Sequence, residues 1–366
     1  MPTLCAEDTP FPFSGNDTFE GVIPAPGDWY GIPLGERFTP HHDVMAYCRE
    51  VAKLSDRVHF QEYGRSTEGR ELVLLMISTE ANIARLEEIR AAQALLADPR
   101  RMKEREDLDL DQLLEDLPAV IWLSYNVHGD ESSATEAALA TIHQLADGSD
   151  EKIRAIRENC LVIIDPLLNP DGRERYLQWY HQVQAHPANP DPAAAEHDPP
   201  SPSGRSNHYL FDLNRDWAWQ SQVETRARIE QYLQWQPLVH VDFHEMSAES
   251  TYFFFPPEKP INANIPEDRV QWSETFGLSN AGAFDRFGWK YYTAEQFDLF
   301  YPAYGDSWPT LNGSIGMTYE QAGGGRAGLA YRRRNGTILT LVDRLHHHHV
   351  AGLATADCAA RHRVQL

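Results

Sequence analysis

Short apolar runs alternate with amphipathic stretches along most of the chain. Apolar residues at helical spacing predict helices near residues 42–54, 82–96, 132–145 and 220–235. Compact apolar runs predict strands at residues 71–77, 119–125, 160–164, 237–243 and 315–319. This alternation is typical of an α/β domain with a mixed, mostly parallel central β-sheet that is flanked by helices on both faces. Ligands of such sheets bind beyond the carboxyl ends of the strands.

Two segments depart from this alternation. Residues 1–40 are rich in Pro, Gly and aromatic residues without a sustained period. We therefore expect an extended N-terminal arm that packs on a single catalytic domain formed by residues 41–366. Residues 185–206 contain six prolines and cannot form a regular helix or strand, so we expect a surface loop there. This loop either forms part of an active-site rim or is an inert insertion.

Composition and charge restrict the partners and the compartment. The net charge of -22 is spread along the chain without a basic stripe, so we expect neither nucleic acid nor a membrane surface as a partner. The four cysteines are far apart and form no CxxC pair, which predicts free thiols. No apolar run reaches the roughly 18 residues of a membrane span, and residues 1–18 do not resemble a signal peptide. The sequence as written predicts a cytoplasmic protein, or a periplasmic or secreted one if a leader was removed; it does not indicate the oligomeric state.

Three residues at the ends of predicted strands form a candidate metal site. His128 and Glu131 directly follow one strand, so an imidazole nitrogen and a carboxylate can reach the same cation. His244 follows a second strand and supplies a third ligand. Three protein ligands leave one position for water, which is typical of catalytic zinc. The segment that begins at His244 is not an HExxH motif, because Ala248 stands where the second histidine would be.

Six short motifs follow one another in a recognisable order. They are His128-Gly129-Asp130-Glu131, Asn169-Pro170-Asp171-Gly172, Asp212-Leu213-Asn214-Arg215, His244, Tyr301-Pro302-Ala303-Tyr304-Gly305 and Thr318-Tyr319-Glu320. Together with residues 63–70, this ordered set resembles the zinc carboxypeptidase family, whose familiar members are carboxypeptidases A and B. The resemblance extends over roughly residues 55–321. Each motif alone is weak, and the order and gaps make the resemblance specific.

The resemblance implies a zinc metallocarboxypeptidase that hydrolyses the C-terminal peptide bond of peptides. It implies one Zn²⁺ per chain, held by His128, Glu131 and His244. Glu320 matches the general base of the family, which takes a proton from the zinc-activated water. Asp212 matches the carboxylate that orients the first histidine. The alternatives are structural: satisfied core histidines, a turn acid at Asp212 and an ion-paired strand-end Glu320.

The same resemblance implies which residues contact the substrate. Asn214 and Arg215 match the residues that hold a free C-terminal carboxylate, for which the planar guanidinium is well suited. The alternative for Arg215 is a structural ion pair. Tyr301 matches a mobile tyrosine that closes over bound substrate, although tyrosines near such turns often only pack. The arginine that polarises the scissile carbonyl is one of three candidates: Arg205, Arg173 and Arg175.

Three further features have two interpretations each. Asp306 falls near the specificity position of the family and would favour a C-terminal Lys or Arg, or it is a local turn residue. Glu245 either faces the pocket and favours cationic substrates or pairs structurally outside it. Residues 346–349 are four consecutive histidines on a predicted helix, and we expect a partly exposed helix face rather than a metal site.

Two rival functions share this fold. One is a zinc amidohydrolase that acts on N-acyl amino acids or peptidoglycan peptides, which would need the same Arg215. The other is a zinc-binding or peptide-binding module without turnover. The presence of Glu320 argues against the second, because family members that lose turnover lack the base.

Overall fold

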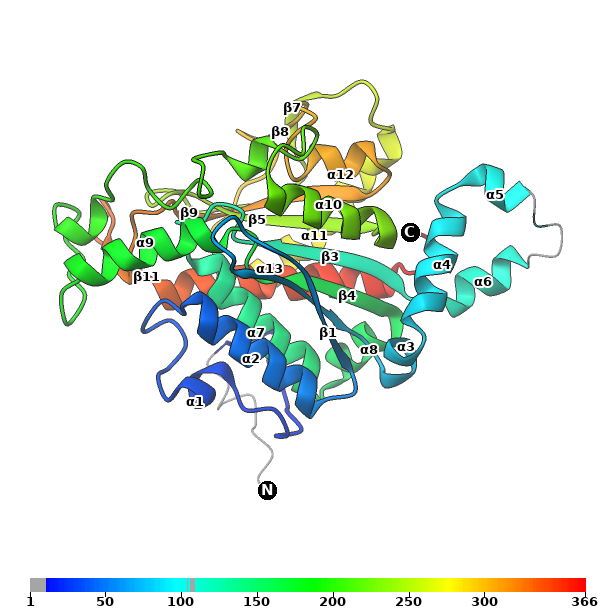
Figure 1. Cartoon of the computed structure of the whole chain (residues 1–366), viewed down its shortest axis with the longest axis horizontal. Coiled ribbons are helices and arrows are strands. Elements are labelled where there is room, and N and C mark those ends of the chain that lie inside the picture. Colours follow the sequence, from blue (N-terminus) through cyan, green and yellow to red (C-terminus); the bar gives the residue numbers. More distant parts are fainter. Residues whose placement is uncertain (1–10, 104, 106–108) are drawn as a thin grey trace.

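A mixed sheet of seven strands forms the centre of the molecule (Figure 1). The computed structural model describes residues 11–103, 105 and 109–366. The strand order is β1-β2-β4-β3-β5-β9-β6, with β1 at Val58–Arg65, β2 at Glu71–Ile77, β3 at Ala119–Tyr125, β4 at Cys160–Asp165, β5 at Val239–Ser247, β6 at Tyr252–Phe253 and β9 at Ile315–Gly323. The four central strands β4, β3, β5 and β9 are parallel. Strands β2 and β6 pair with them antiparallel, and β1 pairs antiparallel with β2. The predicted fold class is confirmed.

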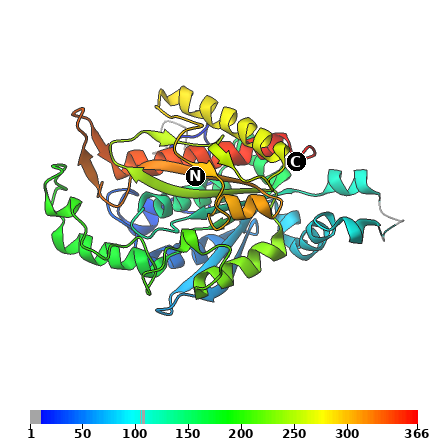
Figure 2. The ribbon, with the colours of Figure 1, turned by 90° about the horizontal axis from the view of Figure 1, so that it is seen from above.

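Helices cover both faces of this sheet, while α5 and α6 extend away from it (Figure 1). The described helices are α1 (Pro26–Tyr30), α2 (His41–Leu54), α3 (Glu80–Ala84), α4 (Leu86–Leu96), α5 (Pro99–Lys103), α6 (Leu110–Asp116), α7 (Ser133–Asp147), α8 (Glu151–Asn159), α9 (Pro170–Val183), α10 (Val223–Trp235), α11 (Glu267–Phe287), α12 (Ser307–Leu311) and α13 (Leu341–Arg361). Figure 2 shows α11 and α13 on one side of the sheet and α10 on the other. Successive residues of β3 alternate between the two layers, since Ile121 packs with α7 and α13 while Trp122 packs with α10. Burial of both faces explains why β3 and β4 are continuous apolar runs.

Two short two-stranded pairs, one parallel and one antiparallel, and two 3₁₀ turns complete the described fold. The pairs are β7 (Glu258–Ile261) with β8 (Asp298–Leu299) and β10 (Ala330–Arg332) with β11 (Ile338–Thr340). The turns are η2 (Ala195–His197) and η3 (Leu213–Arg215). No helix in the described part of the chain is both long enough and apolar enough to span a membrane.

The structure changes several predicted boundaries. The helix predicted near residues 82–96 is two helices, α3 and α4, which meet at Arg85. Strands β5 and β9 both extend beyond the apolar runs, because they remain paired as far as Ser247 and Gly323. His244 and Glu320 therefore lie inside strands and not just beyond them.

Residues 11–40 lie along the surface of the helical layer formed by α2, α7 and α13. Phe13 and Ile23 belong to the same apolar core as these helices. The Asp147 carboxylate at the end of α7 accepts hydrogen bonds from the backbone N–H groups of Gly21, Val22 and Ile23, at 2.9 to 3.0 Å. These contacts hold the described part of the arm on the domain. Residues 1–10 of the predicted arm lie outside the described residues.

The four consecutive histidines of α13 are more buried than the sequence predicts. His346 and His347 are half-buried, whereas His348 and His349 are fully buried. The expectation of a partly exposed helix face is wrong for the latter two, because α13 contacts the sheet, α7, α8 and α11 around its circumference. Burial lowers the pKa of His347, His348 and His349 to about 3, so these imidazoles are neutral at ordinary pH.

The proline-rich segment 185–206 is an irregular surface loop, as predicted, with η2 as its one described helical turn. Arg175 of α9 donates hydrogen bonds to the carbonyls of Ser203, Ser206 and Asn207. The Ser203 hydroxyl in turn donates to Asp130 at 2.7 Å. These bonds attach the end of the loop to the turn that carries His128.

Candidate metal centre and active site

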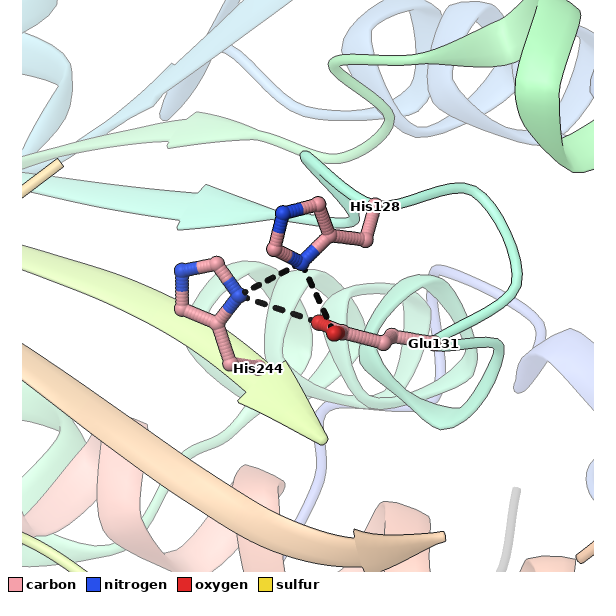
Figure 3. Close-up of side chains that lie close together, drawn as sticks. All are labelled: His128, Glu131 and His244. Carbon is pink, nitrogen blue, oxygen red and sulfur yellow. Dashed lines mark hydrogen bonds and ion pairs between the residues drawn. The ribbon is translucent and has the colours of Figure 1, made fainter. Parts of the chain in front are cut away.

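His128, Glu131 and His244 converge on one point (Figure 3). Glu131 Oε1 lies 2.7 Å from His128 Nδ1, and Glu131 Oε2 lies 3.0 Å from His244 Nδ1. The two Nδ1 atoms are 3.2 Å apart. Tetrahedral zinc with bonds of about 2.0–2.1 Å would place its ligand atoms about 3.3 Å apart. Two imidazoles and one carboxylate at these separations, all buried, fit a zinc ion with one open position.

The turn between β3 and α7 sets the positions of His128 and Glu131. Asn126 adopts a positive φ of 64°, which turns the chain sharply at the end of β3. Its side-chain amide donates to the carbonyls of His128 and Glu131, at 2.8 and 2.9 Å. Gly129 must be glycine, because a Cβ atom would lie 2.1 Å from the backbone nitrogen of Arg173. The sequence therefore encodes the turn as well as its two ligands.

A carboxylate meets the second nitrogen of each histidine. His128 Nε2 lies 3.0 Å from Asp212 Oδ1, as the resemblance implies. His244 Nε2 lies 2.9 Å from Asp242 Oδ2, and Asp242 was not predicted. Its sequence signal is an acid inside an apolar strand, two residues before His244 and thus on the same face of β5. Such carboxylates fix the orientation of a ligand imidazole and leave Nδ1 free for the metal.

These charges shift the pKa values of the site strongly. Burial would lower the pKa of His128, but the charges of Glu131 and Asp212 outweigh it and raise that pKa. The pKa of His244 is raised in the same way, because Asp242 and Glu131 outweigh its burial. Although burial opposes it, contact with His128 holds the pKa of Asp212 far below its usual range. The two imidazoles are thus surrounded by the negative charges of Glu131, Asp212 and Asp242, an environment that favours a divalent cation.

Glu320 lies in the wall of the same cavity. This cavity of about 310 Å³ is lined by all three candidate ligands, by Glu320 and by Arg215, among others. Burial raises the pKa of Glu320 to about 8, and the nearby charge of Glu131 adds to the increase. A carboxylate with a raised pKa is a stronger base than one in water and is suited to proton transfer near neutral pH.

The three candidate arginines have different environments. Arg205 lines the cavity and donates to Asp212 Oδ2 at 2.9 and 3.1 Å, with Nη1 3.4 Å from Glu131 Oε1. Arg173 is fully buried and donates to Glu136 at 2.6 Å. Arg175 holds the proline-rich loop as described above. Of these three, Arg205 is therefore the arginine beside the metal centre.

Asn214 and Arg215 also line the cavity, and Asn214 Nδ2 lies 3.1 Å from His244 Nε2. Asn214 Oδ1 accepts a hydrogen bond from the backbone of Gly305 at 2.7 Å. The Arg215 guanidinium is partly exposed and stacks on the ring of Tyr304, 4.4 Å from its centroid. The guanidinium lies 3.9 Å from the Asp212 carboxylate, which is too long for a direct hydrogen bond. Arg215 thus retains donors for a ligand carboxylate.

The two tyrosines of the Tyr301–Gly305 motif take different places. Tyr304 lines the cavity, whereas Tyr301 lies outside the cavity lining. The Tyr301 hydroxyl accepts a hydrogen bond from the exposed Trp219 indole at 3.1 Å. Sequence reasoning named Tyr301 and missed Tyr304, because only the fold shows which of the two faces Arg215.

Asp306 and Glu245 both line the cavity and both have structural partners. Asp306 caps α12 and accepts a hydrogen bond from the Thr318 hydroxyl at 2.9 Å, and burial raises its pKa to about 6. Glu245 forms a buried ion pair with Arg344 at 3.1 Å and accepts from the backbone of Ser133 at 2.8 Å. The structure thus favours structural pairing for Glu245, one of the two roles left open by the sequence.

Comparison with known proteins agrees with this geometry. The sequence model of the zinc carboxypeptidase family matches residues 44–307. A probable carboxypeptidase 2 from Arthroderma benhamiae is 27% identical over 175 residues, a match that spans 44% of this chain but only 27% of that relative. Among solved structures, carboxypeptidase A from Helicoverpa armigera has a TM-score of 0.57 at 17% identity, with 90% of this chain and 75% of that chain covered. A metallo-carboxypeptidase from Burkholderia cenocepacia has a TM-score of 0.54 at 16% identity, with 87% and 67% covered.

Proposed function

Because the chain belongs to the zinc carboxypeptidase family, we propose that it is a metallocarboxypeptidase that releases the C-terminal residue of peptides. One observation carries the proposal: a single cavity contains the three-ligand cluster, the candidate base Glu320 and the carboxylate-binding candidate Arg215. To cleave the last peptide bond, a hydrolase must hold the terminal carboxylate one residue away from the metal and the base.

The binding step depends on Asn214 and Arg215. The C-terminal carboxylate of the substrate pairs with the Arg215 guanidinium, whose plane is already fixed against Tyr304. Asn214 accepts a hydrogen bond from the Gly305 backbone and lines the same cavity, so it is the second residue that we propose for this carboxylate. A substrate with a blocked C-terminus would leave these donors without an anionic partner, so it would bind weakly.

The hydrolytic step depends on Glu320 and Arg205. His128, Glu131 and His244 would hold Zn²⁺, which when bound supplies the Lewis acidity that makes water nucleophilic near neutral pH. Glu320 accepts the proton of the attacking water and delivers it to the nitrogen of the leaving amine. Arg205 donates hydrogen bonds to the carbonyl oxygen as negative charge develops there.

The residue preference is part of the same proposal. Asp306 lies in the cavity wall together with Asp298 and Thr318. An ionised Asp306 would favour a C-terminal Lys or Arg, because a charged hydrogen bond is worth about 1.5–3 kcal/mol. Its bonds to Ser307 and Thr318 support a fixed position for the carboxylate at this point of the wall.

The test is a zinc measurement combined with a substrate panel. We expect one zinc per purified chain and release of the last residue from peptides with a free C-terminus. The same peptides with a C-terminal amide should remain intact. Preferred cleavage of N-acyl amino acids or of peptides ending in a D-amino acid would indicate the amidohydrolase alternative. Bound zinc without turnover on any member of the panel would indicate a binding module and would contradict the proposal.

A further inference from the structure

The inference concerns His348, a residue of the four-histidine run that lies behind the metal centre. Its side chain is fully buried on the face of α13 that packs against the sheet. Nε2 lies 3.1 Å from the backbone carbonyl oxygen of His244, and Nδ1 lies 2.8 Å from the Tyr252 hydroxyl. The ring also makes an edge contact with Phe243, with centroids 5.1 Å apart. His348 thus contacts the backbone of a candidate metal ligand directly.

The two hydrogen bonds define one tautomer of His348. A carbonyl oxygen can only accept, so Nε2 carries the proton and donates to His244. Nδ1 is then the acceptor for the Tyr252 hydroxyl. Both polar atoms of the ring are satisfied, which is the condition under which an imidazole can be buried without a large cost.

The contact lies where β5 loses one of its neighbours. The ladder between β3 and β5 ends at the pair Tyr125 and Phe243, one residue before His244. The chain leaves β3 at Asn126 to form the turn that carries His128. On the other side, β9 remains paired with His244. The bond from α13 therefore holds the His244 backbone at the point where the support from β3 stops.

The neighbouring histidines provide an internal comparison. His349, the next residue of α13, is equally buried, but its Nδ1 lies 3.0 Å from the Thr141 hydroxyl of α7. His346 reaches the carbonyl of Pro12 in the N-terminal arm. His348 and His349 are thus both buried histidines of α13, but His348 contacts the backbone of a candidate ligand residue and His349 contacts a side chain of α7.

We propose that His348 is a positioning residue of the metal centre, which fixes the backbone of His244 and thereby the approach of its imidazole to the metal. Loss of this bond allows the His244 ring to depart from the geometry shared with His128 and Glu131. Replacing a hydrogen-bonding partner of a metal ligand's side chain typically changes metal affinity by about 10- to 100-fold, and we expect a change of the same order for this backbone contact. The proposal rests on the proposed function only for the metal centre itself and not for its reaction, because zinc affinity is measured without substrate.

Two amide substitutions separate the two hydrogen bonds of His348. Glutamine places an N–H donor near the position of Nε2 and can restore the bond to His244. Asparagine reaches only the position of Nδ1 and can restore the bond to Tyr252 alone. His348→Leu removes both bonds, and His349→Leu is the matched control for a buried histidine of α13.

The experiment measures zinc dissociation constants of the full chain by competition with a chromophoric chelator, together with thermal unfolding of the metal-free proteins. We expect His348→Asn and His348→Leu to weaken zinc binding by about 10- to 100-fold. His348→Gln and His349→Leu should stay within about 3-fold of wild type. Both leucine variants should lower the melting temperature, since each leaves a buried polar partner unsatisfied.

Wild-type zinc affinity in His348→Asn would overturn the proposal, as would an equal loss of affinity in His349→Leu. If His348→Leu does not fold, the comparison between His348→Gln and His348→Asn still decides, because both retain a polar side chain of similar size. Absence of turnover in wild type would contradict the proposed function and would leave the zinc comparison intact.

Discussion

Glu320 lies directly opposite His244 in the parallel pairing of β9 with β5. This register places the candidate base and a candidate metal ligand on adjacent strands at the same level of the sheet. Both side chains line the cavity. The distance between base and metal centre is therefore fixed by backbone hydrogen bonds rather than by a loop.

The first prediction concerns Glu320→Gln. The variant removes the proton acceptor but none of the three candidate ligands, so we expect full zinc content with kcat reduced by about 10²- to 10⁴-fold. Zinc content by atomic absorption and steady-state hydrolysis of a free-acid peptide measure the two effects. Wild-type kcat in this variant would show that another group acts as the base.

The two arginines of the cavity should affect different kinetic constants. Arg215→Ala removes the partner of the substrate carboxylate, and we expect KM to rise by about 10- to 100-fold with a smaller change in kcat. Arg205→Ala removes a donor to the developing oxyanion, and we expect kcat to fall by about 10²- to 10³-fold. Steady-state kinetics on one peptide measures both variants. An increase in KM for Arg205→Ala without a fall in kcat would assign Arg205 to binding instead.

The third prediction concerns the carboxylates behind the histidines. Asp212→Asn and Asp242→Asn remove the charge that orients His128 and His244, respectively, and each should weaken zinc binding by about 10- to 100-fold. Asp216→Asn is the control, because Asp216 is also buried but accepts hydrogen bonds from Ser221. Chelator competition measures all three. Equal zinc affinity in Asp242→Asn and wild type would show that the contact of Asp242 with His244 has no role in metal binding.

Much of this site follows from the order of motifs along the sequence. The apolar runs predict β3, β4 and β5. The polar residues that follow these runs predict the ligands, because neighbouring parallel strands bring their carboxyl ends together. The resemblance to a family then assigns Asp212, Asn214 and Arg215 to positions that the structure brings into one region. These assignments could be made because each depends on residues close in sequence or on a shared motif, and the roles themselves stay predictions.

Other features depend on contacts that no local pattern contains. Asp242 lies inside an apolar strand, and the sequence shows only that it shares a face of β5 with His244; the fold shows that the two side chains meet. Tyr304 is distinguished from Tyr301 by the position of Arg215 in the fold. The burial of His348 depends on contacts with Tyr252 and His244, which lie 96 and 104 residues away in the sequence.

The preference for a basic C-terminal residue should depend on pH. Burial raises the pKa of Asp306 to about 6, so the carboxylate is ionised above that pH and neutral below it. We expect the ratio of kcat/KM for C-terminal Lys over Phe to increase by up to about 10-fold between about pH 5 and pH 7, in proportion to the ionised fraction of Asp306. Asp306→Asn should abolish this increase, whereas Asp298→Asn, a change in the same cavity wall, should retain it. A pH-independent ratio in wild type would exclude Asp306 as the specificity residue.

The last prediction concerns the buried pair of Glu245 and Arg344. Both side chains are almost fully inaccessible to solvent, and Arg344 also donates to the backbone carbonyl of Gly328. Arg344→Met leaves the Glu245 charge without its partner inside the protein, so we expect the free energy of unfolding to fall by about 3–5 kcal/mol. The double variant Arg344→Met with Glu245→Gln removes the uncompensated charge and should recover part of this loss. Urea unfolding of the metal-free proteins measures the free energies of unfolding. If the double variant is no more stable than Arg344→Met, the loss comes from packing around Arg344 and not from the charge on Glu245.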